Sequence, residues 1–236
     1  MGGDLTLYLA GDAIPGYLAM PSQSGPWPGV VVIHQAFGLD DDIRRITDRL
    51  ASMGYLAVAP DLLAEGGFRC LARLFLDVRR GKGAAVEAVE DVVEWITARS
   101  DCSGRVGVIG FCIGGGLAFL LGSSGMVDAI APKYGKAPDA ERLARSCPVV
   151  ASYGRKDRVL AREAESIEAA LGAANIDHDV KVYEEAGHGF MNQVEGHQLM
   201  KMLTRPVMTV AYNRDAAEDA WARVETFFGR HLTNTL

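Results

Sequence analysis

A cysteine stands where the sequence predicts a sharp turn between a strand and a helix. Residues 105–116 read Arg-Val-Gly-Val-Ile-Gly-Phe-Cys-Ile-Gly-Gly-Gly, so an apolar strand runs into a Gly-x-Cys-x-Gly turn and then into an apolar, helix-compatible run. This is the pattern of a nucleophile elbow, with Cys112 where serine is more common. Gly110 and Gly114 have no Cβ that could clash in such a strained turn. We expect Cys112 at the start of a helix, where the helix dipole and free N–H groups favour a thiolate and an oxyanion.

Two further residues could form a catalytic triad with Cys112. Asp157 follows the run 148–153, which has the pattern of a buried strand ending in a glycine turn. His188 follows the alternating run 180–184, in a loop of small residues. The order nucleophile, acid, histidine is typical of this architecture. The alternative, a cysteine that only packs in the core, would leave Asp157 and His188 unexplained. The sequence therefore predicts a Cys112–His188–Asp157 triad.

The chemistry expected of this triad is acyl transfer. The Cys112 thiolate would attack the carbonyl of an ester or lactone, and the N–H groups of Ile113 and of Ala36 or Phe37 would form the oxyanion hole. His188 would protonate the alcohol leaving group and then activate the water that cleaves the thioester. No cofactor is expected.

The other histidines are weaker candidates for the site. His34 ends the apolar run 29–34 and precedes a loop that would face the elbow, so it either reaches the active site or is a hydrogen-bonded residue at a strand end. The remaining histidines are expected to be solvated: His178, His197 and His231. No pair of histidines has metal-ligand spacing, so no metal site is predicted.

The chain resembles the dienelactone hydrolase family of the α/β-hydrolase superfamily, whose best-known activity is carboxymethylenebutenolidase. The resemblance spans most of the chain in the family's order and rests on the segments 34–38, 54–62, 110–115, 134–135, 154–157 and 185–190. It implies a small ester or lactone substrate. Tyr134 and Phe190 stand in matching segments and are further candidates for substrate binding or for tuning the thiol.

Residue 35 departs from the family's pattern. The butenolidase branch usually has Glu three residues before the Gly of the Phe-Gly pair, where it interacts with the resting thiol, and here Gln35 holds that place. A neutral amide can form a hydrogen bond, but it cannot accept the thiol proton or repel a thiolate. We therefore predict that the resting thiol of Cys112 is less restrained than in that branch.

Positive charge gathers between residues 65 and 80, which also lack a clear helical or strand period. The arginines there form either a solvated helix face or a site for an anionic substrate group, and the stretch 61–82 is a candidate lid or substrate loop: Arg69, Arg73, Arg79 and Arg80. A second segment without clear periodicity, 191–212, follows His188 and contains Gln193, Lys201 and Arg205. Arg205 is a further candidate for binding a substrate carboxylate.

Other proteins with a cysteine elbow have partner residues that this chain lacks at the corresponding positions. Class I glutamine amidotransferases pair the cysteine with a later His-x-Glu, which does not follow Cys112. Proteins of the DJ-1 type usually have histidine directly after the cysteine, where this chain has Ile113. A general small carboxylesterase or thioesterase of the same fold, and a non-catalytic, redox-responsive thiol protein, stay as alternatives.

Composition bounds the partners and the compartment. A net charge of −6 without a basic cluster or an aromatic platform argues against nucleic acid and anionic membranes. The stretch 106–127 lacks charge, but its seven glycines favour a strand, turn and helix over a membrane span. Four cysteines in 236 residues do not form a disulfide framework, and no signal peptide is visible, so we expect a cytoplasmic protein that is a monomer or small homo-oligomer.

The elements predict a single domain over residues 1–236 with the α/β-hydrolase fold. Two runs, 5–10 and 14–20, form an antiparallel hairpin around the turn 11–12, and strands and helices then alternate. This pattern predicts a mostly parallel sheet of about eight strands with helices on both faces. The later strands are expected at 29–34, 55–59, 105–110, 127–131, 148–153 and 179–184. The helices are expected at 41–53, 84–99, 112–122, 138–145, 161–173 and 213–230.

Overall fold

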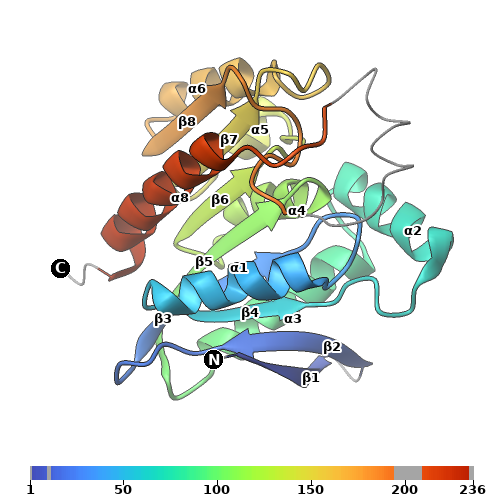
Figure 1. Cartoon of the computed structure of the whole chain (residues 1–236), viewed down its shortest axis with the longest axis vertical. Coiled ribbons are helices and arrows are strands. Elements are labelled where there is room, and N and C mark those ends of the chain that lie inside the picture. The colour runs from blue at the N-terminus through green and yellow to red at the C-terminus, as the bar shows by residue number, and fades with distance from the viewer. Residues whose placement is uncertain (1, 10–11, 194–208, 234–236) are drawn as a thin grey trace.

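One eight-stranded sheet forms the centre of the computed structural model, which describes residues 2–9, 12–193 and 209–233 (Figure 1). Its strands lie in the order β1-β2-β4-β3-β5-β6-β7-β8. The pairs β1/β2 and β2/β4 are antiparallel, and all others are parallel. The strands are β1 (Gly3–Leu9), β2 (Asp12–Ala19), β3 (Trp27–Ile33), β4 (Leu56–Pro60), β5 (Cys102–Phe111), β6 (Ala129–Lys133), β7 (Val149–Gly154) and β8 (His178–Tyr183). The predicted mostly parallel sheet with an N-terminal hairpin is confirmed.

Helices cover both faces of the sheet, as expected of a parallel sheet whose strands are buried on both sides. Helices α1 and α8 pack on one face and lie in front of the sheet in Figure 1, whereas α3, α4 and α6 pack on the other. The helices are α1 (Asp41–Ser52), α2 (Gly67–Arg80), α3 (Ala84–Thr97), α4 (Ile113–Gly122), α5 (Ala140–Leu143), α6 (Glu163–Ala173) and α8 (Arg214–Phe228). A π-helical turn, Gly229–Thr233, continues α8.

Helix α2 corrects the prediction of an aperiodic segment over 61–82. Cys70 and Leu74 are buried and Val78 is half-buried, which is the spacing of one helix face. Phe75 and Leu76 are exposed on another face, and these two large apolar residues hide the period in the sequence. The helix ends at Gly81, whose φ of 67° is the left-handed conformation typical of a helix C-terminus.

Several boundaries differ from those predicted. Strand β6 starts at Ala129 rather than 127. The preceding residue, Asp128, donates its N–H to the Val106 carbonyl and accepts the Val106 N–H with its carboxylate, both at 2.8 Å. The strand continues to Lys133, which is in register with Phe111 of β5. The hairpin turn predicted at 11–12 lies partly outside the described residues.

The uncharged stretch 106–127 contains the end of β5, the turn and α4, as predicted. In the described part of the chain, no helix combines the length and the apolar character needed to cross a membrane.

Candidate functional site

Cys112 lies between β5 and α4 with a strained backbone. Its φ of 55° and ψ of −113° are unusual for a residue with a side chain. A Cβ at Gly110 would overlap the carbonyl oxygen of Gly114, and a Cβ at Gly114 would overlap that of Ile33, so the sharp turn requires glycine at both positions. The Cys112 N–H donates to the Lys133 carbonyl at 3.0 Å, which ties the turn to β6. The Cys112 side chain is half-buried.

Asp157 and His188 are held together by a buried hydrogen bond. His188 Nδ1 lies 2.7 Å from Asp157 Oδ2. The other Asp157 oxygen accepts the N–H groups of Val159 and Leu160 at 3.1 and 3.2 Å, so the loop after β7 orients the carboxylate. Burial would raise the pKa of Asp157, but the hydrogen bond and the charge of His188, together with these N–H groups, lower it. Asp157 is therefore a carboxylate that orients the imidazole.

His188 also interacts with Cys112, and the two side chains line one cavity. Because Nδ1 is bonded to Asp157, the other ring nitrogen, Nε2, is the one that is free for the sulfur. Burial alone would lower the pKa of His188, but the negative charge of Cys112 and the bonds to Asp157 and Cys112 outweigh burial and raise it to about 10. The three side chains predicted from the sequence thus lie together in the order Cys112, His188, Asp157.

A cavity of about 530 Å³ opens beside this group. Cys112 and His188 line it together with the predicted oxyanion-hole residues Ile113, Ala36 and Phe37. Ile113 is the first residue of α4, where backbone N–H groups have no partner within the helix. The rest of the described wall is mostly apolar and comes from α2, the loop after β7 and the segment before α8. It includes Phe75, Val78, Val159, Leu160, Val210, Ala211 and Tyr212.

Gln35 lies on the wall of the same cavity and is only 5 % exposed. Within the residues that the structure describes, its side-chain nitrogen Nε2 has no hydrogen-bond partner. A buried donor without a partner is costly and rare in proteins. The amide nitrogen of Gln35 is therefore a buried donor without a partner among the described residues.

His34 is a strand-end residue rather than part of the cavity wall. Its Nδ1 donates to the Gln35 carbonyl at 2.6 Å, and its Nε2 accepts the Leu62 N–H at 3.0 Å. Burial lowers the pKa of His34, so the ring is neutral, which suits a ring with one donor and one acceptor nitrogen. Of its two predicted roles, the structure places His34 in the hydrogen-bonded strand end.

Tyr134 lines the cavity and packs against His188 with ring centroids 5.1 Å apart. Phe190 is fully buried behind Tyr134 and does not line the cavity. Its proposed contact with substrate is corrected: it supports the Tyr134 ring from the core. The sequence did not distinguish Tyr134 from Phe190, because both stand in segments that match the family.

Two polar residues missed by the sequence analysis hold the loop that carries His188. Asn192 accepts a hydrogen bond from the Tyr134 hydroxyl and donates through Nδ2 to Asp42 at 2.8 Å. Asp42 also accepts the Gln193 N–H at 3.1 Å and is 6 % exposed. In the sequence, Asp42 is one of three consecutive aspartates at a helix start, so no local signal marks it as a support of the site.

Among the described residues, the arginines considered for substrate binding do not line the cavity. Arg69 and Arg73 are exposed on α2, and Arg73 pairs with Glu65 at 3.4 Å. This placement corresponds to the solvated helix face. Arg205 lies outside the described residues, as does Lys201. Among the described residues, no three His, Cys, Asp or Glu side chains are grouped closely enough to hold a metal ion.

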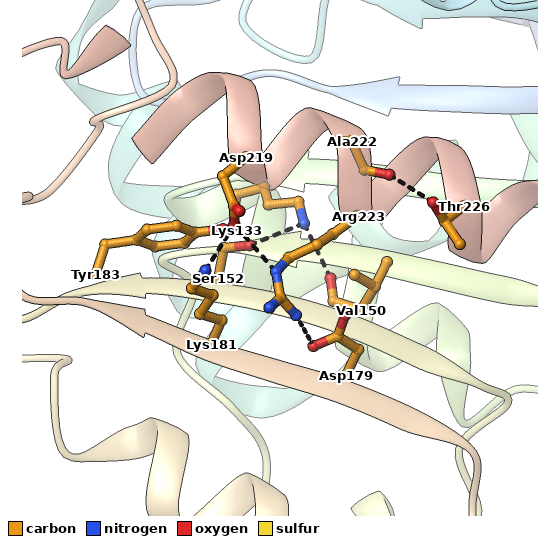
Figure 2. Close-up of polar contacts among 10 residues, drawn as sticks. All are labelled: Lys133, Val150, Ser152, Asp179, Lys181, Tyr183, Asp219, Ala222, Arg223 and Thr226. Carbon is orange, nitrogen blue, oxygen red and sulfur yellow. Dashed lines mark hydrogen bonds and ion pairs between the residues drawn. The ribbon is translucent and has the colours of Figure 1, made fainter. Parts of the chain in front are cut away.

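A second polar cluster lies between β6, β7, β8 and α8 (Figure 2). The fully buried Lys133 donates to the Val150 carbonyl at 3.0 Å and to Ser152 Oγ at 3.2 Å. Burial lowers the pKa of Lys133 to about 7. Near Lys133, the Asp219 carboxylate accepts hydrogen bonds from Lys181, Tyr183 and Arg223. Arg223 also donates to a second carboxylate, that of Asp179. A hollow of about 310 Å³ borders the outer side of this cluster.

Comparison with known families gives a match over almost the whole chain. Residues 14–232 match the model of the dienelactone hydrolase family. A Yersinia pestis protein named "Putative carboxymethylenebutenolidase" is 30 % identical over 252 residues, which cover 97 % of this chain and 88 % of that protein. An Escherichia coli K12 protein of the same name is 30 % identical over 241 residues, covering 94 % and 84 %.

Solved structures with the same fold agree. A Klebsiella pneumoniae protein named "Putative Dienelactone Hydrolase" has a TM-score of 0.78 at 27 % identity, covering 98 % of this chain and 99 % of that one. A dienelactone hydrolase-like promiscuous phosphotriesterase from metagenomic libraries has a TM-score of 0.81 at 23 % identity, covering 98 % of both chains, and supports the fold alone. The chain therefore belongs to the dienelactone hydrolase family of the α/β-hydrolase superfamily and is a carboxylic ester hydrolase.

Proposed function

We propose that the protein hydrolyses small esters or lactones through a thioester formed on Cys112. The observation that carries the proposal is the placement of Cys112 and His188 on the wall of one cavity, where His188 interacts with Cys112 and is hydrogen-bonded to Asp157. A nucleophile, a base and a group that orients the base are the parts that acyl transfer requires. The name of the relatives from Yersinia pestis and Escherichia coli extends the proposal to lactones of the dienelactone type.

The first half of the reaction forms the thioester. In the reacting form of the pair, His188 carries the proton and Cys112 is a thiolate. The interactions with Cys112 and Asp157 raise the pKa of His188 to about 10, which favours the imidazolium. The sulfur attacks the carbonyl carbon, and the oxyanion that forms accepts N–H groups of Ile113 and of Ala36 or Phe37. When the tetrahedral intermediate collapses, the carbon–oxygen bond breaks, and His188 gives its proton to the leaving alcohol.

The second half regenerates the enzyme. His188 is now neutral and takes a proton from a water molecule, whose oxygen attacks the thioester carbonyl. The carbon–sulfur bond breaks, the acid leaves, and the thiolate–imidazolium pair is restored. Asp157 keeps the His188 ring in place through both halves, because its bond to Nδ1 leaves Nε2 directed to the sulfur and the leaving group.

The nucleophile also restricts the substrate. A thiolate is a good leaving group, so a tetrahedral intermediate expels it in preference to a much poorer leaving group such as an amide nitrogen. Esters with acidic alcohols, aryl esters and enol lactones are the substrates that suit this balance, and amides are not.

Trapping the acyl-enzyme tests the proposal. The protein is mixed with p-nitrophenyl acetate, quenched with acid within the first turnovers and digested for peptide mass spectrometry. We expect a burst of nitrophenol and one acetyl group on the peptide that contains Cys112, removable by hydroxylamine. A protein that only senses redox state through this thiol would release at most one equivalent of nitrophenol and would show no turnover. Acetylation at another residue would contradict the assignment of the nucleophile.

A further inference from the structure

The described wall of the cavity beside Cys112 includes polar residues, among them Gln35, Asn192 and Gln193, and a set of apolar side chains that come from separate segments. Phe75 and Val78 come from α2, Val159 and Leu160 from the loop after β7, and Tyr212 from the segment before α8. Because these segments are distant in sequence, no local pattern creates the apolar wall. It arises where the carboxyl ends of the strands bring the loops together.

Large apolar side chains on this wall remain exposed. Phe75 and Val159 are each 50 % exposed and Tyr212 is 37 % exposed. Apolar surface that gathers around one opening, rather than being scattered, marks a place where an apolar group binds. The neighbouring Leu76 is 45 % exposed but does not line the cavity, so exposure on α2 by itself does not define the wall.

The charged groups of the described wall offer little to an anion. Besides His188, the charged residue that lines the cavity is Lys136, and its Nζ lies 2.5 Å from Glu163 Oε1. Arg69 and Arg73 are on α2 but not on this wall. A substrate carboxylate placed against Phe75 or Val159 would lose water without gaining a cation from these described residues, which is strongly unfavourable.

We propose that the acyl group of the substrate is uncharged and apolar, a chain of several carbons or a small ring that contacts Phe75, Val78, Val159 and Leu160. This inference rests on the proposed thioester mechanism and narrows its substrate class. It favours neutral esters over esters and lactones that carry a carboxylate, including the carboxymethylene lactones that the name of the relatives suggests. The cavity of about 530 Å³ has the size of a small-molecule site.

Matched substrates test the charge. The p-nitrophenyl ester of hexanoic acid and the p-nitrophenyl monoester of adipic acid have acyl chains of the same carbon number, and only the second ends in a carboxylate. We expect kcat/KM to favour the hexanoate by at least about tenfold, since burying an unpaired charge is costly. Equal values, or a preference for the adipate monoester, would overturn the inference.

Matched variants test the wall. Each buried methylene is worth roughly fourfold in kcat/KM, so hexanoate should gain over acetate in the unmodified protein. Phe75→Ala should lower kcat/KM for the hexanoate about fivefold more than for the acetate. Leu76→Ala, on the same helix and similarly exposed, should leave the ratio of the two esters unchanged within about twofold. An equal loss on both esters in Phe75→Ala would contradict an apolar acyl site at this residue.

These outcomes separate the inference from the mechanism on which it rests. If no ester acylates Cys112, the proposed function fails and the substrate class falls with it. If Cys112 is acylated and the adipate monoester is preferred, the mechanism stands and only the apolar acyl site is wrong.

Discussion

Two polar clusters in the described part of the chain differ in what their groups face. The first cluster, Cys112, His188 and Asp157, opens into a cavity. The second cluster lies under α8 and surrounds Lys133. Both contain a strongly shifted group, since the pKa of His188 is raised to about 10 and that of Lys133 is lowered to about 7. A shifted pKa alone therefore does not distinguish a reactive site from a structural one.

The difference lies in the use of hydrogen bonds. In the second cluster, Lys133 donates to neighbouring strands, and Asp219 and Arg223 bind each other (Figure 2). In the first cluster, the side chains of Cys112 and His188 lie on a cavity wall, and the buried amide nitrogen of Gln35, a residue of the same wall, has no partner among the described residues. Polar groups that are hydrogen-bonded to one another affect the stability of the fold, whereas polar groups that line a cavity can act on a ligand.

Removing the nucleophile should give the largest effect and is the most direct way to break this comparison. Cys112→Ala is expected to lower ester turnover at least about a thousandfold, because the step that forms the thioester is lost. The melting temperature should change little, since alanine is smaller than cysteine. Cys147→Ala, which removes a half-buried thiol outside the cavity, should keep activity within about twofold. Full activity of Cys112→Ala would refute the nucleophile.

The partners of the nucleophile should follow in size of effect. His188→Ala and Asp157→Ala are each expected to reduce kcat/KM by about a hundredfold or more. The double variant should be little less active than the less active of the two single variants, because the residues act as a unit. Losses that simply multiply would show that the two side chains, although 2.7 Å apart, act independently.

The Gln35 side chain should have a smaller effect, on the thiol itself. Iodoacetamide at neutral pH should alkylate Cys112 faster than the other cysteines, and burial raises the pKa of one of these, Cys147, to about 12. Gln35→Glu should slow alkylation of Cys112 several-fold, because a carboxylate repels the thiolate or holds its proton. Gln35→Met, a neutral residue of similar length, is the control for shape. An equal or faster rate in Gln35→Glu would show that residue 35 does not restrain the thiol.

The second cluster should affect stability and its pH dependence. Lys133 has a pKa of about 7 when folded and an ordinary value of 10.5 when unfolded, so between these values the unfolded chain binds the extra proton. Its contribution to the free energy of unfolding therefore rises with pH, by up to about 1.4 kcal/mol per pH unit. Burial is the main cause, with Asp179 opposing it and Arg223 adding to it.

Lys133→Met tests this contribution. Relative to the unmodified protein, the variant should be most favoured at and below about pH 7 and should lose that advantage progressively as the pH rises toward 10.5, as measured by urea unfolding at several pH values. A stability difference that does not change with pH would show that Lys133 is not held neutral by burial.

Much of the fold and of the site was predictable because its signals are local. The run from β5 into the Cys112 turn, and the strand-then-loop positions of Asp157 and His188, are patterns of a few adjacent residues. The alternation of strands and helices also predicts the parallel sheet, because each helix returns the chain to start the next strand in the same direction. The carboxyl ends of the strands then share one edge. Gly110 and Gly114 leave room for the sharp turn in which Cys112 has its strained φ.

Only the tertiary structure decided what surrounds those residues. The support of His188 by Asp42 and Asn192 joins positions 150 residues apart, and neither residue carries a local signal. The helical period of α2 is hidden by Phe75 and Leu76, and only the fold shows that Phe75 faces the cavity while Arg69 and Arg73 do not. A chain's own pattern specifies which residues turn, pair and react locally, but the lining of a cavity depends on the distances between segments that meet only after folding.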